Sequence, residues 1–289
     1  MTSSQDRWYS AGEWDLEIHP QRPWLAIPVA EIWQYRDLLL LLVRRDFVSL
    51  YKQTILGPLW FLLQPLLTTL MFTLVFGRIA GLSTDGLPRI LFYLAGVTCW
   101  TFISDTLTKT SETFVQNASL FGKVYFPRMI IPLSIVLSSL IKFGVQFVLF
   151  LAFLGWHLFH GAMVHPNAAM LLLPLFLLLM GGIGLGLGMI VTALTTKYRD
   201  LRFLLSFAIQ LIMYATPVIY PLSSLPGEYR WLLMANPLTP IIEGFRFAFL
   251  GQGVLHWLHL FYSTGFMALV LFVALVIFTR VEQTFMDTV

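Results

Sequence analysis

Long apolar runs separated by short polar stretches dominate the pattern along this chain. A membrane-spanning helix needs about 20 mostly apolar residues. The run Leu38–Val43 is too short and lies between charged residues, so it is not a candidate. The pattern therefore predicts an all-α integral membrane protein with six transmembrane helices per subunit. The expected spans cover residues 58–80, 90–112, 129–155, 168–192, 203–220 and 258–279.

The segment 31–56, just before the first expected span, has the pattern of an amphipathic helix. Apolar residues fall on one stripe, while Arg45, Ser49 and Lys52 fall on another at helical spacing. Such a helix lies in the membrane interface, with its basic face toward lipid headgroups or a cytoplasmic partner. A simple positive-inside anchor is the alternative. Gly57-Pro58 then favours a tight turn into the first span. The charged candidates on this interface helix are Arg44, Arg45, Asp46 and Lys52.

Prolines interrupt the stretch 214–253, which runs from the end of the fifth expected span towards the sixth. They occur at positions 217, 221, 226, 237 and 240, so no single straight helix fits there. The pieces "EYRWLLMA" and "TPIIEGFRFAFL" are apolar enough to enter the outer leaflet. Irregular backbone at membrane depth must be covered by protein or line a water-filled cavity. We therefore expect two outer re-entrant or interfacial half-helices within 221–253, an arrangement typical of a gate.

Basic residues are distributed unevenly between the two ends of the expected spans. Twelve Lys and Arg residues fall on the side of the termini and four on the other side, with Lys109 and Lys142 inside or near spans. The positive-inside rule then predicts that both termini are cytoplasmic. Residues 1–30 contain charges and no apolar core, so we expect a cytoplasmic tail rather than a signal peptide. The six-span domain covers 31–289, and no second soluble domain or internal repeat stands out.

Charged residues inside expected spans need partners. Asp105, Lys109 and Glu112 follow one stripe of the second span at i, i+4 and i+7. Lys142 lies near the middle of the third span, where an unpaired charge costs about 3 kcal/mol. We expect Lys142 to face a carboxylate or water, and Asp105 is the candidate partner. Two interpretations remain: a structural ion pair and the lining of a polar path.

The glycines of "GGIGLGLG", residues 181–188, lie in mid-span. They lack the G-x-G-x-x-G register and follow no strand, which excludes a nucleotide-binding turn. Gly182/Gly186 and Gly184/Gly188 are pairs spaced by four residues, which let transmembrane helices pack closely. Close helix packing is therefore the expected role.

Composition supports the membrane assignment and excludes several other classes. The chain is 57% hydrophobic and 11% charged, against roughly 25% charged in a soluble domain. A single cysteine, Cys99, excludes an intramolecular disulfide. The net charge of +3 does not indicate a nucleic-acid partner. The pairs His157/His160 and His256/His259 lack a third ligand, so no metal site is expected.

Motifs for catalysis and nucleotide binding are absent from the sequence. There is no G-x-S-x-G, no H-E-x-x-H and no P-loop, since Gly122-Lys123 is followed by Val124. The chain therefore cannot bind ATP through a P-loop, and if it pumps, its energy must come from elsewhere; no cofactor of its own is expected. A polytopic membrane glycosyl- or acyltransferase is the rival from another class. It would need converging acids or histidines, and the sequence contains no such group.

Residues 117–132, "NASLFGKVYFPRMIIP", form a loop that is the second cytoplasmic element, after the N-terminal segment. The third, "TTKYRDLRF" at 195–203, is short and basic and is interpreted mainly as a topology signal. Aromatic residues together with arginine make up protein–protein hot spots, so the second element is a candidate docking surface. Its candidate residues are Phe121, Lys123, Tyr125, Phe126 and Arg128.

From about residue 31 onward the chain resembles a known family. "VRRDFVSLYKQTILGPLWFLLQP", "NASLFGKVYFPRMIIP", "YRDLRF", "TPVIYP" and "NPLTPIIEGFR" occur in the order found in permease subunits of bacterial ABC transporters that export polysaccharides. These exporters carry O-antigen, capsule or teichoic acid, and the motifs do not distinguish among the three. A drug- or lipid-exporting permease of the same fold is the nearest alternative. Residues 1–30 extend beyond the family pattern and receive no function.

The resemblance implies a transport subunit rather than an enzyme, with partners that composition cannot indicate. Such permeases are homodimers in the bacterial inner membrane and bind two copies of a cytoplasmic ABC ATPase, which holds the ATP and Mg²⁺. By this resemblance, 31–56 is the interface helix, 117–128 the coupling loop and 221–253 the outer half-helices. The substrate is a polysaccharide on a lipid carrier, commonly undecaprenyl diphosphate. Arg44, Arg45 and Lys52 would suit either the ATPase or the carrier's diphosphate.

Aromatic residues in the first two spans are candidates for the sugar path. Sugars present CH faces that stack on aromatic rings, and repeated weak contacts let a chain slide. The alternative is that these rings face lipid or form interfacial belts. The main candidates are Trp60, Phe61, Phe72, Phe76, Tyr93 and Trp100, with Phe92 and Phe102 beside them.

Overall fold

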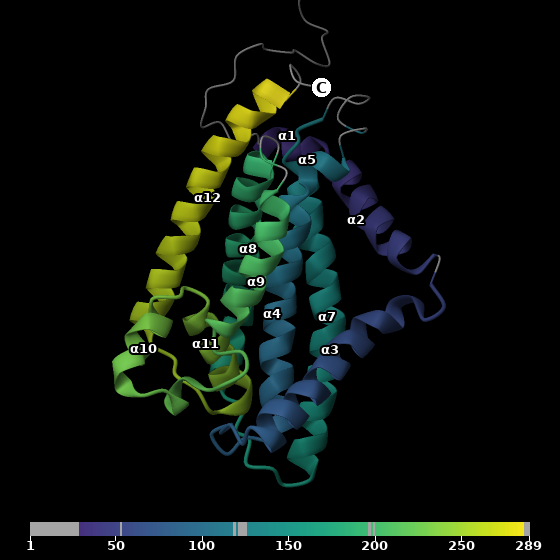
Figure 1. The fold of residues 1–289 in the computed structure, drawn as a ribbon. Helices are drawn as coiled ribbons and strands as arrows, with labels where there is room; N and C mark the ends of the chain where they lie inside the picture. Colours follow the sequence, from purple (N-terminus) through teal and green to yellow (C-terminus); the bar gives the residue numbers. More distant parts are fainter. Residues whose placement is uncertain are drawn as a thin grey trace, which may run out of the picture.

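The computed structural model describes residues 29–52, 54–117, 120, 126–195, 198 and 200–285. All regular secondary structure within these ranges is helical, and long helices form an elongated bundle (Figure 1). The elements are α1 (Val29–Gln34), α2 (Arg36–Tyr51), η1 (Gly57–Leu59), α3 (Trp60–Phe72), η2 (Thr73–Ile79), α4 (Arg89–Ser111), α5 (Thr113–Gln116), α7 (Ile130–Phe159), η3 (Ala168–Leu172), α8 (Leu173–Thr195), α9 (Leu201–Tyr214), η4 (Leu222–Ser224), α10 (Gly227–Met234), α11 (Thr239–Leu250) and α12 (Trp257–Phe285).

Five helical stretches within the described residues are long and apolar enough to cross a membrane. They match five of the six expected spans and cover Gly57–Ile79, Arg89–Ser111, Ile130–Phe159, Ala168–Thr195 and Trp257–Arg280. The chain is therefore a multi-pass membrane protein.

The expected fifth span, 203–220, is not one helix. α9 ends at Tyr214 after 14 residues, which is about 21 Å at 1.5 Å per residue. Pro217 explains the early end, because proline lacks an N–H and disfavours a helical conformation at the residue before it. The chain from 215 to 221 is irregular.

α4 is the central helix of the bundle, and α3, α7, α8 and α11 pack around it (Figure 1). Its residues Leu91, Phe92 and Tyr93 are fully or almost fully buried. α8 packs closely on both α4 and α12. The second expected span, α4, is therefore the helix on which the neighbouring helices pack.

The glycines of α8 allow this packing, as expected. A Cβ on Gly184 would lie 3.1 Å from Thr106 Cβ, and one on Gly188 would lie 2.6 Å from Thr110 Cβ, both on α4. On the other face, a Cβ on Gly182 would meet Met267 of α12 at 2.5 Å. The two glycine pairs therefore serve two different helix partners.

The N-terminal helix is divided and shorter than expected. α1 and α2 are joined at Tyr35, and α2 ends at Tyr51 rather than at residue 56. In Figure 1 α2 leaves the bundle and α3 returns to it, which forms a corner in the chain. Gly57 has φ +51°, a conformation that favours glycine, and Pro58 follows in the first turn of η1. The predicted turn at Gly57-Pro58 is confirmed.

Two short helices occupy the region expected to hold the outer half-helices. α10 and α11 lie at the end of the bundle opposite α1 and α5 (Figure 1). α10 is mostly exposed, whereas all of α11 except Phe247 is buried. α11 packs against α4, α8 and α12, so it belongs to the core of this end.

Candidate functional site

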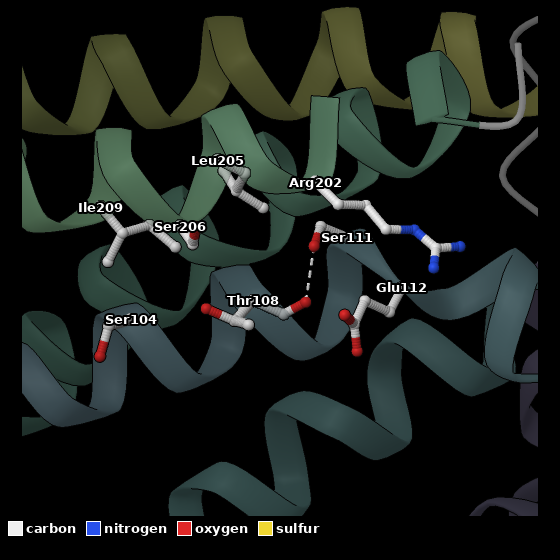
Figure 2. Close-up of a pocket in the computed structure, with 8 residues that line it drawn as sticks. All are labelled: Ser104, Thr108, Ser111, Glu112, Arg202, Leu205, Ser206 and Ile209. Carbon is white, nitrogen blue, oxygen red and sulfur yellow. Dashed lines mark hydrogen bonds between the residues drawn. The ribbon is translucent and has the colours of Figure 1, made fainter. Parts of the chain in front are cut away.

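A polar cavity of about 290 Å³ lies between α4 and α9. Its α4 wall carries Ser104, Thr108 and Ser111 at i, i+4 and i+7, so their side chains share one face (Figure 2). The α9 wall carries Arg202, Leu205, Ser206 and Ile209, which follow the same helical spacing. We call this cavity the α4–α9 groove.

Opposite charges meet at one end of the α4–α9 groove. Figure 2 shows Glu112, which joins α4 to α5, and Arg202 of α9 at the same end of the cavity. No ion pair joins these two side chains within the described part of the chain. Glu112 accepts a short hydrogen bond from Gln116, and Arg202 Nε has no hydrogen-bond partner among the described residues. The second carboxylate oxygen of Glu112 can still accept a bond in the groove, while the unpaired Arg202 Nε is itself buried.

Hydroxyl groups line the rest of the groove. Ser104 donates to Thr101 O at 3.3 Å, Ser111 to Thr108 O at 2.6 Å and Ser206 to Phe203 O at 2.8 Å. Each hydroxyl proton is therefore held by its own helix, while the oxygen keeps capacity to accept a bond. The groove consequently offers several acceptors and one guanidinium donor.

An ion pair lies on a different side of α4. Lys142 Nζ on α7 is 2.6 Å from Asp105 Oδ2, and both side chains are largely shielded. The partner expected from the sequence is therefore present. Lys142 Nζ also lies 5.8 Å from the centroid of the Phe61 ring. Lys109 makes no ion pair with another described residue, so the i, i+4 pairing suggested for it on α4 is not formed.

Most of the aromatic candidates pack inside the subunit. The ring centroid of Phe72 lies 5.5 Å from that of Phe76 and 6.1 Å from that of Tyr93. Tyr93 has no exposed surface, and Phe61, Phe92 and Phe102 are also buried. Trp60 is 47% exposed and Trp100 partly so. Phe72 and Phe76 are also partly exposed, so Trp60 is the one aromatic candidate in the exposed class.

The charged residues of α2 remain at the surface. Arg44, Arg45 and Lys52 are exposed. Arg45 donates to Asp46 Oδ1 at 2.8 Å, so its charge is partly neutralised by its neighbour. The buried face of α2 is formed by Leu42 and Val43.

The coupling-loop candidates divide into two groups. Phe121, Lys123 and Tyr125 lie outside the described residues. Phe126 and Arg128 are 5% and 8% exposed. Phe126 joins a cluster with Leu42 of α2 and Phe278 of α12, so it is not the exposed aromatic that the sequence suggests. Its apolar ring is covered because three helices converge there.

Arg246 of α11 is a buried cation that the sequence reasoning missed. It is 1% exposed and donates to Pro217 O at 2.5 Å and Val218 O at 2.7 Å. Its guanidinium carbon lies 3.7 Å from the centroid of the Phe92 ring on α4. Glu243 Oε1 lies 3.3 Å from Nη1 and supplies the counter-charge. We call this group the Arg246 clamp.

The Arg246 clamp supplies hydrogen bonds to carbonyls of the irregular segment around Pro217. The irregular segment after α9 leaves carbonyls without helical partners, and buried carbonyls must be hydrogen-bonded. Arg246 bonds those of residues 217 and 218, and Asn236 Nδ2 bonds Ala215 O at 3.0 Å. A Cβ on Gly96 would lie 2.8 Å from the Arg246 guanidinium, so α4 needs glycine there.

Sequence signals for these groups existed. Ser104, Thr108 and Ser111 share a helical stripe, and Arg202 lies in the basic loop that was interpreted as topology. Glu243 and Arg246 are charges at i, i+3 in an apolar segment. The spacing along the sequence indicates that residues share a helix face or form a pair. It does not indicate which other helix packs against them.

Comparison with known proteins gives a consistent set of matches. The family model described as "ABC-2 type transporter" matches residues 37–250. An O-antigen export system permease protein RfbA of Klebsiella pneumoniae is 28% identical over 254 residues, covering 87% of this chain and 94% of that protein. The RfbA of Myxococcus xanthus is 30% identical, covering 76% and 83%. The polysialic acid transport protein KpsM of Escherichia coli is 24% identical, covering 84% and 93%.

Proposed function

Because the chain belongs to the ABC-2 type transporter family, we propose that it is the permease subunit of an ATP-driven polysaccharide exporter. The exporter moves lipid-linked polysaccharide, of the O-antigen kind, from the cytoplasmic to the outer face of the inner membrane. The observation that carries this proposal is the match to O-antigen permeases over most of both chains, at up to 30% identity. A relative named for polysialic acid transport supports a sugar polymer as the substrate class.

The active assembly in this proposal is a homodimer with two cytoplasmic ABC ATPases. α9 supports the second copy, because none of its residues is buried and Phe203, Phe207 and Leu211 are exposed. Apolar side chains of a membrane helix must face lipid or another protein surface. α9 together with the irregular segment 215–220 forms the sixth crossing of the subunit. Both termini are cytoplasmic, as supported by the excess of Lys and Arg on their side.

Coupling to the ATPase runs through residues 117–128 and the α2 surface. Phe121, Lys123 and Tyr125 supply the contact, whereas Phe126 and Arg128 anchor the loop to the bundle, which is supported by their burial. Arg44, Arg45 and Lys52 attract either the ATPase or the diphosphate of an undecaprenyl carrier. α10 and α11 form the outer gate.

The substrate path combines the α4–α9 groove with exposed tryptophans. Ser104, Thr108, Ser206 and the Glu112–Arg202 end offer hydrogen-bonding groups that a sugar hydroxyl can use. Trp60 and Trp100 offer faces for sugar CH groups. Such contacts are weak and repeated, which suits a chain that must slide rather than stop.

Deletion and complementation test the proposal. Cells without this gene should lose surface polysaccharide and accumulate the lipid-linked polymer inside. The wild-type chain should restore export only with an ATPase that hydrolyses ATP. If the deletion leaves surface polysaccharide intact but abolishes efflux of a drug or a lipid, the exporter belongs to the alternative substrate class.

Tyr125→Ala tests the coupling role in the same assay. We expect the variant to keep ATP hydrolysis but lose most export, because Tyr125 is proposed to transmit the ATPase motion. Tyr229→Ala on α10 is the matched control, since Tyr229 is exposed and far from the coupling loop in the chain. Equal export by both variants contradicts the coupling role and leaves the substrate class untouched.

A further inference from the structure

A second polar cavity of about 470 Å³ lies at the α10–α11 end of the molecule. Separate segments build it: Asp85 comes from the loop before α4, Ser223 from η4, Arg230 from α10 and Glu243 from α11. Gln252 comes from the turn after α11. We call this cavity the outer pocket. It lies at the opposite end of α9 from Arg202 and shares no residue with the α4–α9 groove.

The walls of the outer pocket are held in place by internal bonds. Ser223 Oγ donates to Asp85 Oδ1 at 2.6 Å, which joins η4 to the loop before α4. Arg230 donates to the carbonyls of Ser223 and Leu225, both at 3.2 Å. Glu243 is 3% exposed, and the Arg246 clamp fixes its carboxylate from behind. The pocket is therefore preformed rather than assembled by its ligand.

The charges of the outer pocket select against ions. Two carboxylates, Asp85 and Glu243, would repel a phosphate group. Arg230 on the rim would repel a metal cation, and two carboxylates alone are a poor ligand set for one. With the Arg246 guanidinium behind Glu243, the local charges balance. A neutral ligand is therefore favoured.

Donors and acceptors in the outer pocket match a polyhydroxyl compound. The Asp85 carboxylate accepts hydrogen bonds, while the Arg230 guanidinium and the Gln252 amide donate them. Glu243 is 3% exposed and paired with Arg246, so it contributes charge rather than an open acceptor. Gln252 is exposed and its side chain makes no hydrogen bond to another described residue. Leu222 and Val254 add apolar surface for CH groups. A sugar ring presents these same features, with hydroxyls at its edge and CH groups on its face.

We propose that the outer pocket binds sugar residues of the polysaccharide as the chain leaves the membrane. This inference rests on the proposed function for the presence of the polymer. Because the pocket is open and its contacts are few, binding is weak. It holds the emerging chain against backward sliding while the next segment enters the α4–α9 groove.

Site-specific photo-crosslinking tests the proposal in cells that export polysaccharide. A benzophenone amino acid replaces Val254, an apolar residue of the pocket lining, or alternatively Ser224, which is exposed and follows the lining residue Ser223. The control replaces Phe159, which is 93% exposed at the end of α7 and is not part of the pocket lining. We expect polysaccharide to attach to the protein from the Val254 or Ser224 position, and only while the partner ATPase hydrolyses ATP.

Asp85→Asn provides the second arm. Asn tolerates the positive φ of +53° at this position and can still accept the bond from Ser223, so the fold is preserved. It weakens the acceptor for a sugar hydroxyl, and we expect the crosslinked yield from Val254 to fall about fivefold. Protein abundance in the membrane should not change.

The outcomes separate this inference from the proposed function. Equal crosslinking from Phe159 and Val254 overturns the outer pocket, as does an unchanged yield in Asp85→Asn. The same holds if surface polysaccharide is normal and neither pocket position captures sugar. If the wild-type chain exports no polysaccharide at all, the proposed function fails and the outer pocket fails with it.

Discussion

α9 and α11 are both short apolar helices in the C-terminal half, yet their surroundings differ completely. α9 has 14 residues and none is buried, whereas α11 has 12 residues and only Phe247 is not buried. Phe245 of α11 packs between Phe150 and Phe249, while Phe207 of α9 is 58% exposed. Helices with similar composition therefore fill the core at one place and lie on the outside of the subunit at another.

The polar residues of the two helices also differ in burial: they are enclosed in α11 and line an open groove in α9. In α11 the charged pair Glu243 and Arg246 is enclosed and bonded, so it stabilises the fold. In α9 Arg202 and Ser206 line an open groove, and Arg202 makes no ion pair with a described residue. A buried charge that is satisfied indicates architecture, and an accessible charge without an ion pair indicates a place for a ligand.

Arg246→Met should have the largest effect, because it removes the cation of the enclosed charged pair in α11. The variant leaves Glu243 and two carbonyls buried without their partner, and we expect a loss of about 3–5 kcal/mol in the free energy of unfolding. Denaturant unfolding of the purified protein in detergent measures it. Arg230→Met is the matched control, since Arg230 also bonds two carbonyls but is exposed. Similar losses in the two variants would show that burial of Arg246 contributes nothing.

Phe245→Ala and Phe207→Ala compare the two helices directly. Removal of the buried Phe245 ring should cost about 3–5 kcal/mol of unfolding free energy, because a cavity remains in the core. Removal of the exposed Phe207 ring should change that free energy by less than about 0.5 kcal/mol. Phe207→Ala should instead lower the dimer fraction in crosslinking of native membranes. Equal destabilisation by both substitutions would contradict the contrast between α9 and α11.

Gly188→Ala extends the comparison from α11 to the tightly packed contact of α8 with α4. The added Cβ would lie 2.6 Å from Thr110 Cβ and 2.9 Å from Leu107 O, so the helices must separate. We expect a loss of about 1–3 kcal/mol in unfolding free energy. Gly265→Ala on α12 has nothing within 4 Å of the new Cβ and should be neutral or stabilising. The same sign in both variants would contradict the packing role.

Thr108→Val should have the smallest effect on stability, and it tests the role of the open α4–α9 groove. Thr108 is exposed in the α4–α9 groove, so the unfolding free energy should change by less than about 0.5 kcal/mol. Loss of one hydroxyl from the path should lower the rate of polysaccharide export about two- to threefold. Thr264→Val on α12 is the control outside the groove. Unchanged export in Thr108→Val would argue against the groove as part of the path.

The sequence predicts those features that depend on local pattern. Hydrophobic runs locate five membrane-crossing helices, and Gly57-Pro58 locates the corner between α2 and α3. The glycine pairs of α8 and the Lys142–Asp105 ion pair also follow from spacing and from the cost of a charge in lipid. Each of these features can be predicted from a single stretch of the sequence, or from a charged residue that must find a partner within the membrane.

Other features depend on which helices pack against one another, and the spacing of residues in the sequence does not predict these contacts. The expected span 203–220 ends early because Pro217 breaks it, and the break is tolerated only because Arg246 and Asn236, distant in sequence, bond its carbonyls. Phe126 looks exposed in its loop but is covered by α2 and α12.

By itself the amino-acid sequence determined that the chain is helical, lies in a membrane and carries buried charges that need partners, because these follow from local hydrophobicity and spacing. Only the tertiary structure decided that α11 is enclosed and α9 is not, and that Arg202 opens onto a groove while Arg246 clamps a broken helix. Burial depends on contacts between segments far apart in the chain. Two helices with the same pattern can therefore become core or surface.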